Sequence, residues 1–256
     1  MMDSKNMRIV LVTGANQGIG FQVAKELAMR GKKVLLGSRD KKRGEKAAKE
    51  IGNGCVAIHL DVTDRKSIQD ASEFIRREYG RLDVLVNNAG ISNTRMQKLG
   101  LSMHEYMAST RASIASIDEM RVVWDTNVFG VLTVYQAMLP LLRESKDARI
   151  VNVSSTLGSL NLNADPNSDY SSFYSPVYAA SKTALNGITL SMMLELKDTS
   201  IKVNLVSPGF TKSALTNFEG FESLEDGARE VVSVAELGPE GPTGTFTTWD
   251  NVLVPW

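Results

Sequence analysis

Tyr178 and Lys182 are two residues whose side chains could transfer a proton, and they lie four positions apart in Tyr178-Ala-Ala-Ser-Lys182. The apolar periodicity of residues 176–197 predicts a helix, which places both side chains on one face with Cβ atoms about 5–6 Å apart. Lowering a tyrosine pKa to neutrality requires about 4 kcal/mol, which one unit charge supplies at about 4 Å in a medium of effective dielectric constant near 20. The pair is a candidate general acid and base, although a tyrosine on an amphipathic helix more often packs in the core.

The segments that must position this pair alternate between strand and helix patterns along the chain. Short apolar runs predict strands, and longer stretches with apolar residues at helical spacing predict helices. Such alternation is typical of an α/β fold of the Rossmann type, a doubly wound parallel sheet with helices on both faces, and residues 1–256 are expected to form one domain. The predicted strands are 8–13, 34–37, 55–60, 82–86, 149–153, 201–206 and part of 246–254, and the predicted helices are 18–30, 40–51, 64–79, 116–144 and 176–197.

Composition narrows the class of partner. Lys plus Arg equals Asp plus Glu at 29 each, and the sequence pI is about 6.8, so no global basic field favours nucleic acid or an anionic membrane. With one cysteine, Cys55, and two histidines, we expect no metal site and no intrachain disulfide. The sequence contains no apolar run long enough for a membrane span. We therefore expect a cytoplasmic protein that binds small molecules.

A glycine-rich turn joins the first predicted strand to the first predicted helix. In Thr13-Gly-Ala-Asn-Gln-Gly-Ile-Gly20, Gly14 permits a tight turn, Gly18 allows the backbone to approach a pyrophosphate, and Gly20 allows close packing of helix on strand. The start of the helix adds free N–H groups and partial positive charge. The turn therefore predicts nucleotide binding, although a glycine turn needed only for packing would share part of the pattern.

Four motifs in this order resemble the short-chain dehydrogenase/reductase family and cover nearly the whole chain. They are TGANQGIG at 13–20, Asn87-Asn-Ala-Gly90, the segment from Tyr178 to Lys182, and Ser207-Pro-Gly209. The resemblance implies an oxidoreductase with a dinucleotide cofactor, and it is greatest to the carbonyl-reductase-like branch that prefers NADPH. The cofactor-binding residues that it implies, together with the glycine turn, are Gly14, Asn16, Gln17, Gly18, Ile19, Gly20, Asp61, Val62, Asn88, Ala89, Gly90, Tyr178, Lys182, Pro208, Gly209, Thr211 and Ser213.

The end of the second predicted strand indicates which dinucleotide binds. NAD-binding proteins of this fold carry an acidic residue there for the ribose 2′-hydroxyl, whereas this chain has Ser38 and Arg39. A guanidinium can bond a 2′-phosphate with two N–H groups, and Ser38 could donate to it as well. We therefore expect NADP(H), with the reservation that Asp40 could partly neutralise Arg39 and that Arg39 could simply begin a solvated charged run.

The resemblance also implies a catalytic set of Asn127, Ser155, Tyr178 and Lys182. Ser155 would hold a substrate carbonyl while Tyr178 protonates its oxygen, and Lys182 would lower the pKa of Tyr178 and bond the nicotinamide ribose. Asn127 would hold a water beside Lys182. A serine pair at a strand end is otherwise more often a turn or cap, and an asparagine in a helix can simply face solvent.

Three loops are expected to form the substrate side, at 91–115, 156–175 and 210–240. The first is too long for an ordinary connection, and 160–175 looks like an insertion relative to the family. His104 and Tyr106 are candidate substrate contacts, although such residues more often pack a loop. Ser116 and Glu119 have the spacing of a capping box that starts the helix after the first loop.

The sequence therefore predicts an NADPH-dependent oxidoreductase that reduces a ketone or aldehyde to an alcohol, with Tyr178 as general acid. Two alternatives stay open, an NAD-dependent alcohol dehydrogenase of the same family and a catalytically silent dinucleotide-binding regulatory protein. Both a monomer and a homo-oligomer are compatible with the sequence. The family usually pairs through two long central helices, and the insertion before Tyr178 could interfere with that contact.

Overall fold

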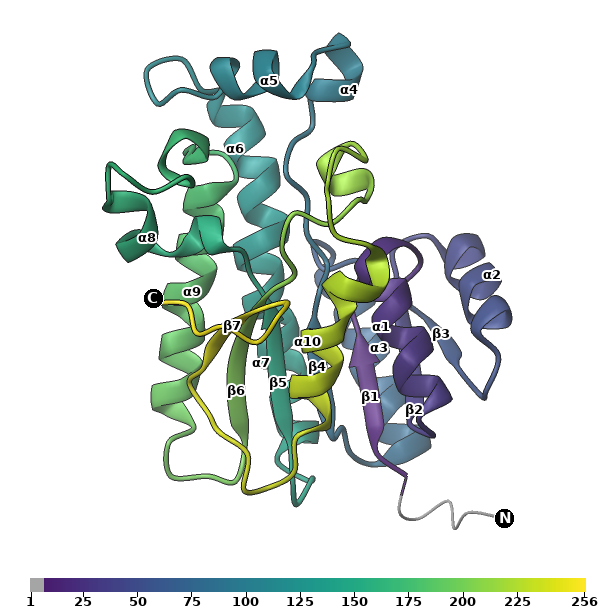
Figure 1. The fold of residues 1–256 in the computed structure, drawn as a ribbon. Coiled ribbons are helices and arrows are strands. Elements are labelled where there is room, and N and C mark those ends of the chain that lie inside the picture. Colours follow the sequence, from purple (N-terminus) through teal and green to yellow (C-terminus); the bar gives the residue numbers. More distant parts are fainter. Residues whose placement is uncertain (1–6) are drawn as a thin grey trace.

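The computed structural model describes residues 7–256, which form one seven-stranded parallel sheet (Figure 1). Its strand order is β3-β2-β1-β4-β5-β6-β7, so the direction of winding reverses between β1 and β4. The strands are β1 Ile9–Val12, β2 Lys33–Ser38, β3 Val56–His59, β4 Val84–Asn87, β5 Arg149–Val153, β6 Lys202–Ser207 and β7 Phe246–Thr248. This order confirms the predicted doubly wound Rossmann-type sheet, in which ligands collect at the carboxyl ends of the strands beside the reversal.

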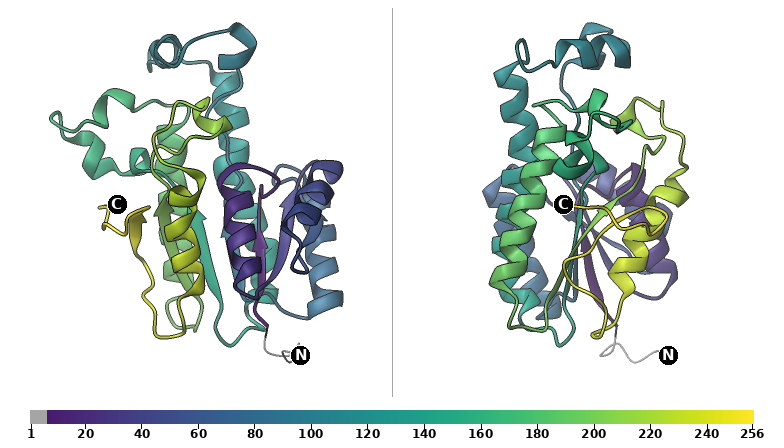
Figure 2. Two further views of the ribbon diagram at one scale, coloured as in Figure 1. Left: turned by 45° about the vertical axis from the view of Figure 1, so that its right-hand side comes forward. Right: turned by 60° about the vertical axis from the view of Figure 1, so that its left-hand side comes forward.

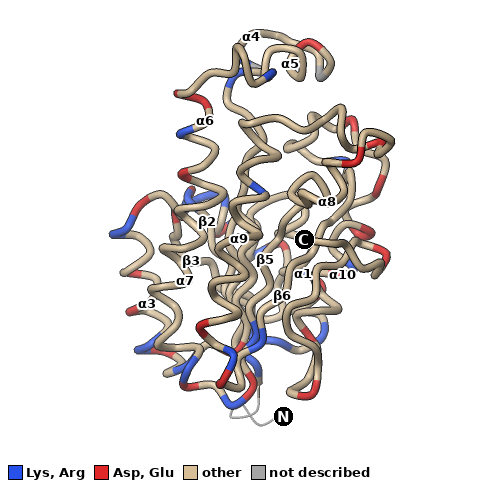
Figure 3. The backbone as a smooth tube through the Cα atoms, turned by 90° about the vertical axis from the view of Figure 1, so that its left-hand side faces the viewer, with Lys and Arg blue, Asp and Glu red and all other residues tan. Residues whose placement is uncertain are grey.

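Helices cover both faces of the sheet (Figure 2). One face packs under α1, α2 and α10, and the other under α3, α7 and α9. The bounds are α1 Gly18–Met29, α2 Lys41–Ile51, α3 Arg65–Tyr79, α7 Val131–Leu142, α9 Ala179–Glu195 and α10 Leu224–Glu236. Lys and Arg are interspersed with Asp and Glu along α3 and α10, whereas α7 has no charged residue (Figure 3). In the described part of the chain, no helix is long and apolar enough to cross a membrane.

Strand β1 shows why continuous apolar runs predicted strands here. Val10 and Val12 join the apolar core beneath α1, α2 and α10, whereas Ile9 and Leu11 join the core beneath α3, α7 and α9. Successive side chains of a strand point to opposite faces, so a strand covered on both faces favours apolar residues at successive positions. The strand is therefore held by two cores at once.

The helix predicted over 116–144 is interrupted in its middle. It begins as α6 Ile117–Trp124, widens into a π-helical turn at Asp125–Gly130, and continues as α7, within which Pro140 is accommodated. Asn127 lies in the π-helical turn. A π-helical turn closes its hydrogen bonds over five residues instead of four, and such turns are frequent at functional sites.

The first substrate-side loop, 91–115, contains two short helices. It contains α4 Met96–Leu99 and α5 Met103–Ser109, which lie beyond the sheet at the end of α6 (Figure 1). Ser116 caps α6 as predicted, but Glu119 does not complete the capping box. The buried Glu119 carboxylate instead accepts from the backbone N–H groups of Thr94 and Arg95 at 2.7 and 3.0 Å, and pairs with Arg95 Nε at 2.8 Å. Glu119 therefore holds the loop against α6.

The predicted insertion and the loop after β6 also carry short helices. The insertion begins after a 3₁₀ turn at Thr156–Gly158 and contains α8 Leu160–Ala164 and a 3₁₀ turn at Ser171–Phe173. The loop after β6 contains a 3₁₀ turn at Ala214–Thr216. Both segments rise on the same side of the sheet as α4 and α5, beyond the carboxyl ends of the strands (Figure 1).

Candidate active site

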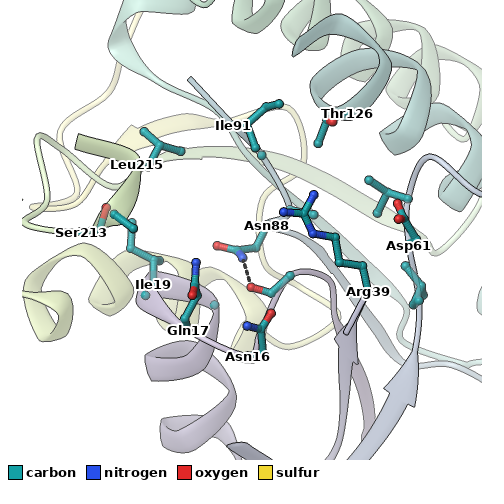
Figure 4. Close-up of a pocket in the computed structure, with 18 of the residues that line it drawn as sticks. Asn16, Gln17, Ile19, Arg39, Asp61, Asn88, Ile91, Thr126, Ser213 and Leu215 are labelled. Atoms are coloured by element: carbon teal, nitrogen blue, oxygen red, sulfur yellow. Dashed lines mark hydrogen bonds between the residues drawn. The ribbon is translucent and has the colours of Figure 1, made fainter. Parts of the chain in front are cut away.

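A cavity of about 330 Å³ lies at the carboxyl ends of β1 to β4, beside the reversal of strand order (Figure 4). It brings together residues that follow five different strands and that the sequence assigned to cofactor binding. Those that line it are Gly14, Asn16, Gln17, Gly18, Ile19, Gly20, Arg39, Asp61, Val62, Asn88, Ala89, Gly90 and Ser213. The structure therefore places most of the predicted cofactor residues on one surface.

The glycine turn has the backbone conformation that the sequence predicted. Gly14 and Gly18 have φ of +63° and +60°, in the left-handed region that favours glycine. Helix α1 begins at Gly18 without a side-chain cap and without an acidic residue in its first turn. Its N–H groups are therefore available to an anion in the cavity.

Asn88 holds the glycine turn against the end of β4. Its side-chain Nδ2 donates to the carbonyl oxygens of Thr13 and Gly14 at 2.9 and 3.2 Å. The Thr13 hydroxyl in turn accepts from the backbone N–H of Asn88 at 3.0 Å. Figure 4 shows Asn88 between the turn and the cavity. Asn88 thus shapes the cofactor cavity in addition to lining it.

Arg39 extends into the cavity from the end of β2 (Figure 4). Asp40 does not neutralise it: the Asp40 carboxylate caps α2 by accepting from the backbone N–H of Arg43 at 3.0 Å, and pairs with the Arg43 guanidinium at 3.6 Å. Ser38 does not reach the cavity. It is fully buried, and its hydroxyl donates to the Asp40 carbonyl at 2.8 Å.

The buried position of Ser38 has a packing cause. A Cβ atom placed on Gly44 would lie 2.9 Å from the Ser38 Cβ, so α2 approaches β2 closely because residue 44 is glycine. The predicted hydrogen bond from Ser38 to a 2′-phosphate is therefore not available in this structure, and Arg39 is the residue of the pair that faces the cavity.

Tyr178 and Lys182 meet at the start of α9. Tyr178 is the residue before the helix, and the Lys182 Nζ lies 5.8 Å from the centroid of the Tyr178 ring. Lys182 is 4% exposed, and its Nζ donates to the Val153 carbonyl at the end of β5 at 2.9 Å. Ser155 follows β5, and its hydroxyl accepts from the backbone N–H of Leu157 at 3.2 Å. Ser155, Tyr178 and Lys182, the predicted set, are thus brought together at the carboxyl end of β5.

The pKa values of the pair differ from the prediction. Burial raises the pKa of Tyr178 to about 12, while the nearby Ser155 hydroxyl acts to lower it. Burial lowers the pKa of Lys182 to about 8. The sequence argument considered only the attraction between the two groups, but removal from water disfavours the charged form of each. Tyr178 is therefore fully protonated at neutral pH, as a proton donor must be.

The Asn127 side chain joins the segment after β4 to helix α9. Its Oδ1 accepts from the backbone N–H of Ile91 at 2.9 Å, and its Nδ2 donates to the Ile91 carbonyl at 2.9 Å and to the Ser181 hydroxyl at 3.0 Å. Both N–H groups of the amide are thus engaged by protein atoms, and the predicted role of Asn127 in holding a water stays a prediction.

Gly90 connects the cavity to the catalytic set. It lines the cavity, and a Cβ atom placed on it would lie 3.3 Å from Asn127 Oδ1 and 3.6 Å from Lys182 Nζ. A ligand that fills the cavity as far as Gly90 therefore reaches the neighbourhood of the lysine. Lys182 and Asn127 therefore lie next to the Gly90 wall of the cavity.

Residues 8–221 match the protein family described as short chain dehydrogenase. The chain belongs to this family. Short-chain dehydrogenase anuI of Penicillium roqueforti is 36% identical to it over 96% of both chains. The (−)-isopiperitenone reductase of Mentha piperita is 32% identical over 96% of this chain and 98% of its own. These matches confirm the resemblance that the four motifs indicated, and the protein is accordingly an oxidoreductase.

A solved structure gives the same result for the fold. The structure of salutaridine reductase from Papaver somniferum superimposes with a TM-score of 0.77 at 28% identity, and the match covers 93% of this chain and 99% of that one. The seven-stranded sheet and its helical layers are therefore those of this short-chain dehydrogenase family.

The loop after β6 supplies cavity residues that sequence reasoning did not name. Gly209 has φ of +76°, and Thr211 is buried with its hydroxyl on the Pro208 carbonyl at 2.8 Å. Of this predicted group only Ser213 lines the cavity. Its neighbours in the cavity wall are Lys212, Ala214, Leu215, Phe218 and Leu224. The sequence signal that could have identified these residues was their position after a strand of the sheet, because a loop shows no apolar periodicity.

The two residues of the first loop that were candidate substrate contacts differ in burial. Tyr106 is buried at 4% exposure and packs the first substrate-side loop, whereas His104 is exposed.

The first loop contacts the loop after β6, because the Ser92 hydroxyl donates to the Leu215 carbonyl at 2.8 Å. The cavity residues not named from the sequence also include Leu60, Thr63, Ile91 and Thr126.

Proposed function

We propose that this short-chain dehydrogenase reduces a ketone or aldehyde to an alcohol with NADPH as the hydride donor. The observation that supports this most strongly is the pairing of the half-buried Tyr178 with the buried Lys182, next to a cavity that the glycine turn lines. Two relatives that match the chain are named as reductases, which supports the reductive direction.

The cavity fits a dinucleotide phosphate. The first turn of α1 faces it with free N–H groups, and Arg39 supplies a cation at the end of β2. Glycine at position 20 leaves room for the Asn88 side chain against the turn. When bound, NADPH supplies the hydride that adds to the carbonyl carbon of the substrate. Arg39 would bond its 2′-phosphate, and the backbone of the glycine turn would bond its pyrophosphate.

The residues of the chain supply the proton and the orientation. The Ser155 hydroxyl donates a hydrogen bond to the substrate carbonyl oxygen. As negative charge develops on that oxygen, Tyr178 transfers its phenolic proton to it, which completes the alcohol. The Lys182 ammonium stabilises the phenolate that remains on Tyr178. Asn127 and Gly90 hold the surrounding backbone so that these groups stay adjacent.

The preference for NADPH is expected to depend on Arg39. Changing Arg39 to alanine removes a cation that faces the cavity, so we expect KM for NADPH to rise about 10- to 100-fold while KM for NADH changes little. Steady-state kinetics with both dinucleotides measures this. Arg43→Ala is the matched control, because Arg43 lies in the same charged run but pairs with Asp40. A wild-type protein that prefers NADH would contradict the assignment.

The pH dependence of reduction is expected to follow Lys182. Because burial lowers the pKa of Lys182 to about 8, its ammonium is present below that pH and is lost above it. We expect kcat to be level near neutrality and to fall up to about tenfold per pH unit on the alkaline side. A profile of kcat against pH for wild type and Lys182→Arg tests this, since arginine stays charged. A wild-type rate that stays level well above pH 8 would be inconsistent with the role.

The function itself is tested by incubating purified protein with NADPH or NADH and a panel of ketones, aldehydes and quinones. We expect oxidation of NADPH that depends on a carbonyl compound and yields the alcohol. Tight NADPH binding without turnover on any compound would instead support the regulatory alternative.

A further inference from the structure

Ser181 lies between the two catalytic candidates in the chain and is completely buried. Its hydroxyl donates to the Tyr178 carbonyl at 2.6 Å and accepts from Asn127 Nδ2 at 3.0 Å. A serine hydroxyl within a helix can bond a carbonyl of its own helix three or four residues back. Ser181 does this and also joins its helix to a side chain from another element.

The Tyr178 carbonyl is the acceptor that closes the first turn of α9. It accepts from the backbone N–H of Lys182 at 3.1 Å as well as from the Ser181 hydroxyl. Helix α9 has no side-chain cap at Tyr178. Ser181 therefore supplies a second hydrogen bond at the turn that fixes where Lys182 lies relative to Tyr178.

The orientation of the Asn127 amide is determined by its other contacts. The backbone N–H of Ile91 must face Oδ1, and the Ile91 carbonyl must face Nδ2. The second N–H of Nδ2 then points to Ser181. Through one buried amide, the hydroxyl of Ser181 is connected to the segment after β4 that includes Gly90, which lines the cofactor cavity.

We propose that Ser181 is a positioning residue that holds the Tyr178 and Lys182 turn in register with Asn127 and the Gly90–Ile91 backbone. This inference rests on the proposed function for its catalytic consequence, whereas the hydrogen-bonded junction itself is made only of groups of this chain. Loss of the hydroxyl leaves one N–H of a fully buried amide without a partner and removes one bond from the first turn of α9.

The test compares Ser181→Ala with wild type. Alanine is smaller than serine and is the best helix former, so the variant is expected to fold. We expect kcat for carbonyl reduction to fall about 10- to 100-fold, because a small misplacement of catalytic groups is costly, while KM for NADPH stays within about twofold. Amide hydrogen exchange of the apoprotein should be faster at Ile91 and Lys182 than in wild type.

Ser72→Ala is the matched control for a buried serine. The Ser72 hydroxyl on α3 also donates to a carbonyl, that of Ala137 at 2.9 Å, but it lies in the core between α3 and α7. This variant should keep wild-type kcat and unchanged exchange at Ile91 and Lys182. Equal losses of kcat in the two variants, or wild-type kcat in Ser181→Ala, would overturn the proposal.

The exchange measurement separates this inference from the proposed function. If wild-type protein reduces no carbonyl compound, the proposed function fails, and faster exchange at Ile91 and Lys182 in Ser181→Ala alone still supports the junction. Unchanged exchange at both amides overturns the junction whatever the activity of the wild type.

Discussion

Replacing Tyr178 with phenylalanine is expected to reduce kcat about 1,000-fold while NADPH binds with nearly unchanged affinity. The substitution removes the only atom of the side chain that carries a transferable proton and keeps the ring over Lys182. General acid catalysis by a positioned side chain contributes roughly 100- to 10,000-fold, so the loss should lie in this range. The ring contributes no charge to the cofactor cavity, which explains why binding should persist.

The measurements are steady-state kcat and the dissociation constant for NADPH from fluorescence titration. Tyr79→Phe is a suitable control, because Tyr79 is the last residue of α3, packs edge-to-face on Phe74 with ring centroids 6.3 Å apart, and does not line the cavity. It should retain the wild-type rate. Full activity of Tyr178→Phe would show that another group supplies the proton.

Replacing Gly20 with alanine is expected to weaken NADPH binding about 100-fold or more. An added Cβ would lie 2.7 Å from the Gly14 carbonyl oxygen and would also collide with the Asn88 side-chain Nδ2. The first atom belongs to the backbone of the glycine turn and the second holds that turn in place. The turn must therefore move, and displacement by a fraction of an ångström disturbs every hydrogen bond that it makes to phosphate.

Gly187 provides the control for this substitution. It lies in the middle of α9, and no heavy atom lies within 4 Å of a Cβ placed on it. Gly187→Ala should leave NADPH binding unchanged and raise the free energy of unfolding by about 0.5–1 kcal/mol, since glycine is unfavourable inside helices. Titration calorimetry and thermal unfolding distinguish the two variants. Tight NADPH binding by Gly20→Ala would mean that the cofactor does not use this turn.

The elements of the sheet were predictable because their sequence pattern has a single physical cause. The apolar run at 8–13 contains strand β1, Ile9–Val12, and the strands on either side of it differ from prediction by a residue or two. A strand covered on both faces cannot carry polar residues at many positions, so its ends are marked by the change in composition. The glycine turn was predictable for a similar reason, because Gly14 and Gly18 adopt conformations that favour glycine.

The details of the catalytic set depended on contacts that no local pattern encodes. The π-helical turn at Asn127 leaves the apolar periodicity of the helix almost unchanged, but it directs the amide to Ile91 and Ser181. The burial of Ser38 depends on glycine at position 44, which allows α2 to cover it. The direction of the Tyr178 pKa shift required knowing how deeply both members of the pair are buried.

The central claim is that hydride from NADPH reaches a carbonyl carbon at this site while Tyr178 supplies the proton. The most direct test uses NADPH deuterated at the transferable position of the nicotinamide ring, a carbonyl compound that the wild type reduces, and mass spectrometry of the product. We predict an alcohol with deuterium on the carbinol carbon, formed by wild type and almost absent with Tyr178→Phe. An alcohol without deuterium, or no alcohol from any carbonyl compound tested, would contradict the claim.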